Sequence, residues 1–461
     1  MANKNKRSAF SKALSFIDLA GIPGPRGLKY IGFVRAFQRD ILGSFTRANL
    51  EYGEIASFPW PMNSVIIYSP ELIKKVLVDD NRKYMKGEQI EELRAVVGDG
   101  LATNNDHESW LQSRKLVARE FSKKSLTKFY ETFSSEATSH FKDLAGSEID
   151  ICEEFKALTF KIACLTILGK RLSDEEGAIV NAAVDYTSVV VYERIFHFFP
   201  IPYWVPTMTN LQFNAHFRNL DRIVRRLIGE QKEESHGESI LAMLVGASDE
   251  DTGYSFSINQ LRDEILTLML AGHETSAHSL TWICGLLAKH PEIQQKLASE
   301  CAKVEASDFE GITNLPYLKQ VLNEGMRLYP AFPVLSRKTR EDVELGSYQL
   351  EKGTNVVLPI YVTQRSELYW ESPEVFNPDR FAGDAGVETQ KSYKFLPFSR
   401  GPRRCLAELF AMDEMAIIIH HLMTNYHLEL AGSELPQDVA YVSLKPVGGM
   451  RIKLRAREKS S

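Results

Sequence analysis

The stretch Phe398–Cys405, FSRGPRRC, places a single thiol after a basic turn. One glycine and one proline disfavour regular structure there, and Arg400, Arg403 and Arg404 make the turn positively charged. The apolar pattern that follows predicts an amphipathic helix with Cys405 in its first turn, where free amides and the positive helix end lower the pKa of a thiol. The stretch therefore predicts a cysteine that can serve as a thiolate.

Two other residues of this loop suit a flat ligand that carries negative charge. Gly401 has no side chain and permits a close approach of the backbone to such a ligand. Arg403 stands two residues before the cysteine, where its guanidinium could reach an anionic group at the rim of the ligand.

The composition is that of a large globular protein. The chain has 461 residues, of which 44% are hydrophobic and 25% charged, and this excludes a disordered chain. Lysine and arginine number 55 against 60 aspartate and glutamate, so the net charge of −5 is too mild to indicate a nucleic-acid partner. No apolar run reaches the ~18 residues that a membrane-spanning helix needs, and no transmembrane anchor is expected.

Neither a linker nor an internal repeat divides the chain, which predicts a single domain over residues 22–461 after a basic tail, residues 1–21. A soluble tail is favoured, with a membrane-surface helix or a short organelle presequence as alternatives. The five cysteines are odd in number and form no Cys-x-x-Cys pair, which favours a reducing compartment.

The periodicity predicts a mainly α fold with a smaller β portion. Residues 110–297 are dominated by apolar residues at helical spacing, whereas strands are expected near residues 55–68 and 342–362. Near the C-terminus, residues 441–457 resemble a hairpin that turns at Gly448 and Gly449.

One helix is expected to cross the whole domain. Ser257 and Gln260 form a capping box, and the helical pattern continues to His290, a length of about 33 residues or roughly 50 Å. In its middle, LMLAGHETSAHS brings polar residues into the apolar pattern. Gly272 weakens the helix and Thr275 can bond the carbonyl of Ala271, so a notch for a small polar ligand such as dioxygen is predicted, with a simple kink as the alternative.

Charged residues of this helix and of two later segments are further candidates. Glu274 could act with Thr275 in proton transfer, or it could be a solvated surface acid. Glu324 and Arg327 in NEGMRLYP lie on one helix face, and Arg380 in FNPDRF is expected to need a carboxylate partner such as Glu324. His273 and His278 are five residues apart, which disfavours a shared metal site.

Together these motifs resemble those of the cytochrome P450 family of haem-thiolate monooxygenases. The cysteine loop resembles the family pattern Phe-x-x-Gly-x-Arg-x-Cys-x-Gly, with Ala407 in place of the last glycine. AGHETS is similar to the acid-alcohol motif of the family's central helix, EGMR to its Glu-x-x-Arg, and NPDRF to the arginine that completes a triad. WLQSR, which contains Trp110 and Arg114, resembles a further element near the haem.

The resemblance implies the P450 fold, a triangular α-rich lobe with a β-rich lobe, and haem b buried between the central helix and the cysteine-loop helix. Cys405 would be the axial iron ligand. The other expected cofactor-binding residues are Arg403, Arg114, Arg337, Trp110, Phe398, Gly401 and Ala271.

The resemblance also implies the reaction, insertion of one oxygen atom of O2 into a hydrophobic small molecule such as a fatty acid, terpenoid or steroid. Glu274 and Thr275 would be catalytic, and Glu324, Arg327 and Arg380 would form a structural triad. A substrate pocket is expected from apolar residues: Leu101, Leu268, Phe332, Val334 and Val447. A haem-thiolate isomerase, dehydratase or peroxide-using enzyme is the alternative, and a non-catalytic haem sensor is a second one.

In motif style the chain is most similar to stand-alone bacterial haem domains and to those of fused fatty-acid hydroxylases. No flavin- or nicotinamide-binding segment follows the haem domain in this sequence, so a separate ferredoxin or flavodoxin with its reductase is the expected electron donor. A basic docking face is expected from Arg400, Arg404, Lys391 and Lys394, with scattered solvated charge as the alternative. A cytoplasmic, bacterial location is expected, with peripheral membrane contact left open.

Overall fold

The computed structural model describes residues 19, 21–59, 62–196, 201–234 and 237–457. The basic tail expected over residues 1–21 lies almost wholly outside these residues. In the described part of the chain, none of the helices is both long and apolar enough to cross a membrane.

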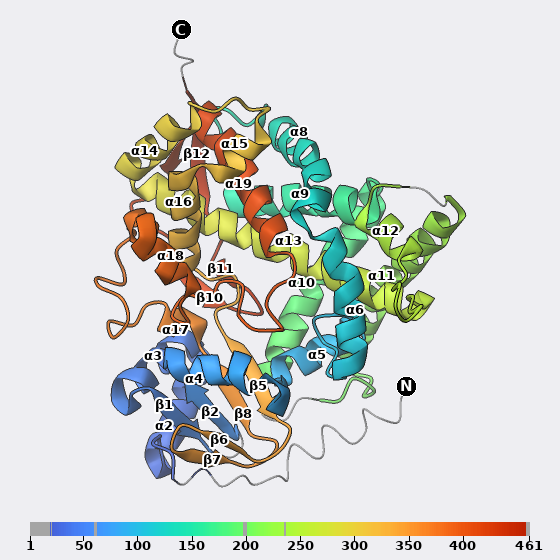
Figure 1. Cartoon of the computed structure of the whole chain (residues 1–461). Helices are drawn as coiled ribbons and strands as arrows, with labels where there is room; N and C mark the ends of the chain where they lie inside the picture. The colour runs from blue at the N-terminus through green and yellow to red at the C-terminus, as the bar shows by residue number, and fades with distance from the viewer. Residues whose placement is uncertain (1–18, 20, 60–61, 197–200, 235–236, 458–461) are drawn as a thin grey trace.

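The β-rich part centres on a five-stranded sheet in the order β1-β2-β8-β5-β3. Strands β2 and β8 pair in parallel and the other neighbours pair antiparallel. The strands expected near residues 55–68 therefore form one sheet with strands nearly 300 residues later, and Figure 1 shows these blue and orange strands side by side. The strand bounds are β1 Ile55–Phe58, β2 Ser64–Ile67, β3 Tyr84–Lys86, β5 Leu335–Thr339 and β8 Asn355–Leu358.

Three smaller sheets complete the strands. A three-stranded sheet has the order β4-β12-β9, and two further sheets are the pairs β6-β7 and β10-β11. Their bounds are β4 Glu148–Asp150, β6 Val343–Leu345, β7 Tyr348–Leu350, β9 Tyr426–Leu430, β10 Asp438–Ala440, β11 Leu444–Pro446 and β12 Arg451–Ala456. The expected hairpin at Gly448 and Gly449 is wrong, because β11 pairs with β10 whereas β12 pairs with β4 and β9.

Helices make up most of the described residues, as the sequence predicted. Those flanking the five-stranded sheet are α2 Gly27–Arg39, α3 Ile41–Tyr52, α4 Pro70–Lys74 with a π-helical turn over Lys75–Asp79, α5 Glu88–Val97 and α17 Ile360–Thr363. The remaining helices are α6 His107–Glu120, α7 Lys123–Leu126, α8 Tyr130–Phe141, α9 Ile151–Ala163, α10 Asp174–Phe196, α11 Met208–Glu234, α12 Ile240–Gly246, α13 Ile258–Lys289, α14 Pro291–Cys301, α15 Phe309–Asn314, α16 Pro316–Leu328, α18 Gly383–Lys391 and α19 Glu408–Asn425.

The central helix α13 is confirmed. It has 32 residues, close to the expected length, and the capping box of Ser257 and Gln260 lies at its start. It runs without interruption through Gly272, although Thr275 Oγ1 donates to Ala271 O at 2.6 Å as expected. A side-chain bond of this kind leaves the backbone ladder of the helix intact here, so the helix is not broken where the notch was expected.

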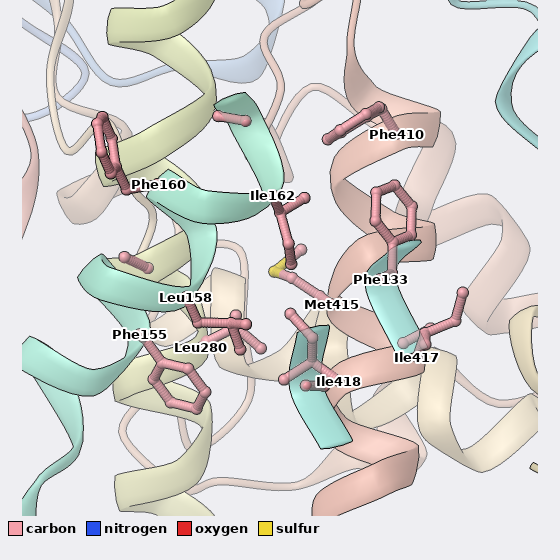
Figure 2. Packing of buried hydrophobic residues seen from close by; sticks show 14 of the residues in the cluster. Phe133, Phe155, Leu158, Phe160, Ile162, Leu280, Phe410, Met415, Ile417 and Ile418 are labelled. Carbon is pink, nitrogen blue, oxygen red and sulfur yellow. The ribbon is translucent and has the colours of Figure 1, made fainter. Parts of the chain in front are cut away.

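The core lies where α13 meets α9 and α19. Figure 2 shows Phe155 and Leu158 of α9 beside Leu280 of α13, and Ile162 of α9 beside Met415 of α19. Most residues of α13 from Leu261 to Ala288 are buried, because other elements cover it on almost all sides. Helix α16 also approaches α13 closely, since a β-carbon at Gly325 would lie 2.5 Å from Cγ1 of Ile283. The helix that carries AGHETS is thus fixed by rigid packing.

Candidate functional site

The cysteine loop is folded by its own backbone. Cys405 N donates to Phe398 O at 2.9 Å, and Arg404 N donates to Gly401 O at 3.0 Å. Helix α19 begins at Glu408, three residues after the cysteine, so the expected place of Cys405 in the first helical turn is wrong. Its side chain remains exposed, whereas the other four cysteines are buried.

Gly401 is required by its backbone conformation and its neighbour. Its φ of +76° lies in the left-handed region, and a β-carbon would come within 2.0 Å of Leu77 O. This glycine therefore makes a close approach to the π-helical turn that contains Leu77, and its expected approach to a flat ligand stays a prediction. The absence of a side chain at residue 401 allows the π-helical turn Lys75–Asp79 to pack directly against the cysteine loop.

The pKa of the Cys405 thiol is raised, opposite to the expected direction. Although the residue has exposed surface, protein atoms crowd around the sulfur and desolvate it, and this effect exceeds the lowering by the Ala407 amide and by the charges of Arg114 and Lys86. The positive loop alone does not make a thiolate. A metal ion held by the sulfur would supply the missing positive charge, because a coordinating thiol is deprotonated outright.

Four cations gather beside this cysteine. Lys86 ends strand β3, Arg337 lies in β5, Arg114 in α6 and Arg403 in the cysteine loop. The pKa of Lys86 is lowered well below its ordinary value by burial and by the charges of Arg337 and Arg403. Burial likewise lowers the pKa of Arg337 to about 10, and burial with neighbouring arginines lowers that of Arg403 to about 9. Mutual repulsion of this kind indicates a site for an anion.

The hydrogen bonds that the three arginines donate within the described part of the chain all go to carbonyls. Arg403 Nη1 donates to Asn104 O at 2.8 Å, and Arg114 Nη2 to Arg404 O at 3.1 Å. Arg337, only 6% exposed, donates to the carbonyl of its own neighbour Ser336. None of the four cations forms an ion pair with a carboxylate among the described residues. The sequence reasoning did not include Lys86, because a lone lysine in a short strand carries no motif.

Trp110 orders two of these arginines. The indole is 2% exposed, and the guanidinium carbons of Arg403 and Arg114 lie 3.8 and 5.5 Å from its ring centroid. Cation–π contacts of this kind hold both guanidinium groups on one aromatic platform. The residues present fit a haem, since an open thiol and unpaired cations suit iron and two rim carboxylates respectively.

The acid and the alcohol that the sequence singled out lie next to each other in the middle of α13. Glu274 is 6% exposed, and Thr275 is half-buried with its hydroxyl on Ala271 O. Ala271 is exposed and presents a small side chain on the same face. The neighbouring histidines are core residues, because His273 meets Lys156 O and His278 meets the Ser443 hydroxyl. Among the described residues no group of three or more candidate ligands could hold a separate metal ion.

Glu324 and the two expected arginines meet in the interior. Arg327 donates from Nε to Glu324 Oε2 at 2.6 Å and from Nη2 to Oε1 at 2.8 Å, and both side chains are fully buried. Arg380 Nε donates to Glu324 Oε1 at 3.3 Å. Arg327 Nη1 also donates to the carbonyls of Gln364 and Pro373 at 2.8 and 2.7 Å. This triad is fully satisfied, as a buried ionic group must be.

Gln364 connects the triad to the cysteine loop and was missed by the sequence reasoning. Its Nε2 donates to the carbonyls of Met326 and Arg327, both at 3.0 Å, and its Oε1 accepts from Leu396 N at 2.7 Å. Leu396 stands two residues before Phe398, where the loop begins. No motif marks a single glutamine in a loop, so only the structure identifies this connection.

A cavity of about 50 Å³ lies between the five-stranded sheet and helices α3 and α5, with Lys86 and Arg337 at its wall. Phe332 and Val334, two of the residues expected to line a substrate pocket, are part of its lining. Of the other expected pocket residues, Leu268 is buried on α13, Leu101 is partly buried, and Val447 is 53% exposed in the turn after β11. These three are not part of its lining, which is otherwise mainly apolar: Ile41, Ile90, Leu93, Pro333, Leu335, Ser336, Ala440, Tyr441 and Val442.

The comparison with known families decides the identity. The model of the cytochrome P450 family matches residues 22–450. The chain belongs to the cytochrome P450 family. The family identifies it as a haem-binding, haem-thiolate monooxygenase, and the mainly α fold with small sheets is consistent with the P450 fold.

Known P450 relatives come from plants, animals and bacteria. The chain is 29% identical over 422 residues to the protein LUTEIN DEFICIENT 5, chloroplastic, of Arabidopsis thaliana, covering 84% of this chain and 69% of that protein. It is 27% identical to cytochrome P450 4d2 of Drosophila melanogaster, covering 95% and 94%. It is also 27% identical to cyclooctatin synthase of Streptomyces melanosporofaciens, covering 76% and 77%.

The basic residues outside the P450 cysteine site are partly engaged. Arg404 pairs with Glu408 one turn away, and Arg400 donates to Gln390 O. Lys391 pairs with Glu388 at 3.3 Å, while Lys394 donates to Tyr369 O at 3.1 Å. Arg404 and Lys391 are exposed, and the other two are partly buried, so positive charge remains beside the loop.

Proposed function

We propose that this P450 binds haem b through Cys405 and inserts one oxygen atom of O2 into a hydrophobic small molecule. The observation that carries the proposal is the group of four cations, Lys86, Arg114, Arg337 and Arg403, that meets no carboxylate among the described residues and stands beside an open thiol. Two propionate groups of haem b would give these cations the anionic partners that the chain does not provide.

Each residue of the site has a task in this proposal. Cys405 holds the iron, and the bound haem supplies the redox chemistry that activates O2. The carbonyl oxygen of Phe398 accepts a hydrogen bond from the backbone N–H of Cys405, and this bond fixes the direction of the sulfur. The small side chain of Ala271 leaves room on α13 for the cofactor. Thr275 and Glu274 deliver protons to O2, and the hydroxyl of Thr275 is oriented by its bond to Ala271 O. A peroxide-using enzyme, isomerase or dehydratase would not need Thr275 and Glu274.

The substrate is proposed to be hydrophobic because the wall of the cavity is mainly apolar. Leu101, Leu268, Phe332, Val334 and Val447 are the proposed contacts. The relatives act on different molecules by their names, among them a cytokinin hydroxylase of Arabidopsis thaliana and a pentalenene oxygenase of Streptomyces avermitilis. Fatty acids, terpenoids and steroids therefore all belong in the search for the substrate.

Electrons are proposed to come from a separate ferredoxin or flavodoxin with its reductase. The exposed charges of Arg404 and Lys391 and the partly buried charges of Arg400 and Lys394 would attract an acidic donor to the cysteine face. The whole of residues 22–461 is proposed as one domain. A reducing, cytoplasmic location is proposed because all five cysteines are unpaired.

The decisive experiment is the carbon monoxide difference spectrum of the reduced holoenzyme. A thiolate-type spectrum is expected for the wild type and its loss for Cys405→Ala. A lipophilic compound library is then screened for shifts of the ferric spin state, and hits are tested for O2-dependent products with a surrogate ferredoxin system. A wild type without the thiolate-type spectrum would refute the proposal, and full turnover with peroxide alone would favour the alternative enzyme classes.

Thr275 provides a sharper test of the proton role. Thr275→Ala is expected to leave the spin-state titration unchanged while product formed per electron pair falls roughly ten-fold or more, because the hydroxyl that organises proton delivery is lost. Thr275→Ser should restore coupling. Thr281→Ala is the matched control, since Thr281 makes the same bond to the carbonyl four residues earlier, at 2.7 Å, in a buried part of the same helix.

A further inference from the structure

The segment Gly98–Asn104, which joins α5 to α6, is held on α13 by two neighbouring carboxylates. Leu101 N donates to Glu264 Oε2 at 2.9 Å, and Asp99 N donates to Asp263 Oδ2 at 2.9 Å. Neither bond belongs to regular secondary structure. Side chains of α13 therefore satisfy backbone amides of a connecting segment more than 160 residues away in sequence.

The glycines of this segment fit tightly against the same helix. A β-carbon at Gly98 would lie 2.2 Å from Asp263 Oδ2, and one at Gly100 would lie 2.1 Å from Thr267 Oγ1. Within the segment, Thr103 Oγ1 donates to Gly98 O at 2.6 Å, which closes the turn. The contact between segment and helix is thus shaped on both sides.

The far end of the segment reaches the proposed haem site. Asn104 O accepts from Arg403 Nη1, which stacks on Trp110 of the following helix. The segment is therefore fixed at one end by α13 and at the other by a cation of the cofactor site. Leu101 carries one of the bonds to α13 and lies three residues before Asn104.

Glu264 is a buried acid, only 1% exposed. Burial raises its pKa to about 7, against the lowering by the Leu101 amide and the Ser113 hydroxyl, and nearby Asp263 raises it further. Tyr254 is the phenol whose pKa Glu264 in turn raises. Charged groups on the surrounding elements are paired with one another: Arg94 with Asp99, Lys115 with Asp249 and Asp251, and Arg262 with Asp221 and Asp263.

We propose that Glu264 is a positioning residue that holds Leu101 and its segment against α13, beside the cations of the haem site, and so controls access to the haem. This inference rests on the proposed function in assigning Leu101 to the substrate side. The ionised carboxylate makes the stronger, charge-assisted bond to Leu101 N, so the segment is held more firmly above about pH 7 than below it.

The test uses the holoenzyme and two probes that need no known substrate. Hydrogen exchange is followed for the peptide covering residues 98–106, and the association rate of carbon monoxide with the reduced haem is measured after photolysis. Glu264→Ala is expected to raise exchange of the 98–106 peptide roughly ten-fold, the value of one charge-assisted bond, and to speed carbon monoxide association a few-fold.

Glu264→Gln separates positioning from mere structure. Glutamine keeps an acceptor for Leu101 N but is never charged, so it should match the wild type at pH 6 and exchange faster than the wild type at pH 8. Asp413→Asn is the matched control: Asp413 is also a buried acid with a raised pKa, but it accepts from Tyr130 at 2.6 Å. This control should leave both probes at wild-type values at each pH.

Several outcomes overturn the inference. In Glu264→Ala, these are exchange of the 98–106 peptide equal to the wild type, or a rise in exchange spread over the whole chain. Unchanged carbon monoxide association in the same variant is another. The last is a Glu264→Gln variant that keeps the wild-type pH dependence. A reduced wild type without the thiolate-type spectrum would instead refute the proposed function, while the exchange data would still decide whether Glu264 holds the segment.

Discussion

Two groups of arginines in this molecule have similar burial but opposite electrostatics. Around Glu324, Arg327 and Arg380 share one carboxylate and several carbonyls, and Arg327 is fully buried. Around Cys405, Arg337 and Arg403 repel Lys86 and meet only carbonyls among the described residues. The first group is complete within the chain, whereas the second is complete only with an anion from outside.

The difference teaches how to separate structural from functional arginines. A buried cation costs folding free energy unless it is paired, so an arginine with a carboxylate and carbonyls is explained by the fold. A set of buried cations that lower one another's pKa values is not explained by the fold. Such a set indicates a ligand, and here its charge and place fit the rim of a haem.

The largest expected effect comes from breaking the complete group. Glu324→Ala leaves the charge of Arg327 uncompensated in the interior, and the free energy of unfolding should fall by about 3–5 kcal/mol, with loss of haem loading. Chemical denaturation followed by circular dichroism measures this change. Glu388→Gln, which breaks the exposed pair with Lys391, is the control and should change stability by less than about 0.5 kcal/mol. A stable Glu324→Ala protein with full haem content would contradict the structural role.

Arg337→Met should have the opposite character. Arg337 bonds only the carbonyl of its own neighbour, so its removal relieves repulsion and leaves the fold as stable as in the wild type. Haem should leave the variant roughly ten-fold faster, because one charge-assisted contact to the cofactor is lost. Transfer of haem to excess apomyoglobin measures the rate. A variant that unfolds easily but keeps haem at the wild-type rate would reverse the assignment of the two groups.

Lys86 adds a pH dependence to the same comparison. Without an anion its pKa lies well below the ordinary 10.5, and bound propionates should raise it again. The bound form therefore holds its proton to higher pH than the free form, so the affinity contributed by Lys86 is present at low pH and is lost as the pH rises through the pKa of the bound form. Haem transfer from the wild type should accelerate over this range, and Lys86→Met should lack that contribution. Identical pH profiles of the two proteins would argue against contact with the cofactor.

The smallest effect is expected for arginines outside both groups. Arg404 is exposed and pairs with Glu408 at the start of α19, so Arg404→Gln should change stability by less than about 0.5 kcal/mol. Charge reversal at Arg400 and Arg404 should slow reduction by an acidic ferredoxin a few-fold at low salt and little at high salt, as measured by stopped-flow reduction. Unchanged rates at low salt would favour scattered solvated charge.

The fold was predictable where the pattern is local. The capping box of Ser257 and Gln260 and the apolar period after it defined α13 to within one residue. Strand pairing was not predictable, because β2 finds its parallel partner β8 almost 300 residues later and period-two patterns do not name a partner. The mistaken hairpin at Gly448 and Gly449 has the same cause, since both flanking strands pair with other segments.

The site was predictable where a motif carries a charge pairing. Glu324, Arg327 and Arg380 meet as expected, because buried guanidinium groups require a carboxylate. The thiol pKa was mispredicted, since desolvation outweighs the basic loop and cannot be read from loop sequence. Lys86, Gln364 and Glu264 were missed because their roles arise only from tertiary contacts.

The bonds of Gln364 have a consequence for biosynthesis. The side-chain amide of Gln364 connects the end of α16 to Leu396, just ahead of the cysteine loop. Its partners on both sides are backbone atoms. The cysteine loop can therefore fold before the cofactor arrives. We expect haem insertion to be the binding of haem to a loop that is already folded. Hydrogen exchange at the Leu396 amide in newly made, cofactor-starved protein measures this order of assembly. Strong protection of this amide would mean that the loop folds before haem binds, whereas free exchange would mean that haem binding organises the loop.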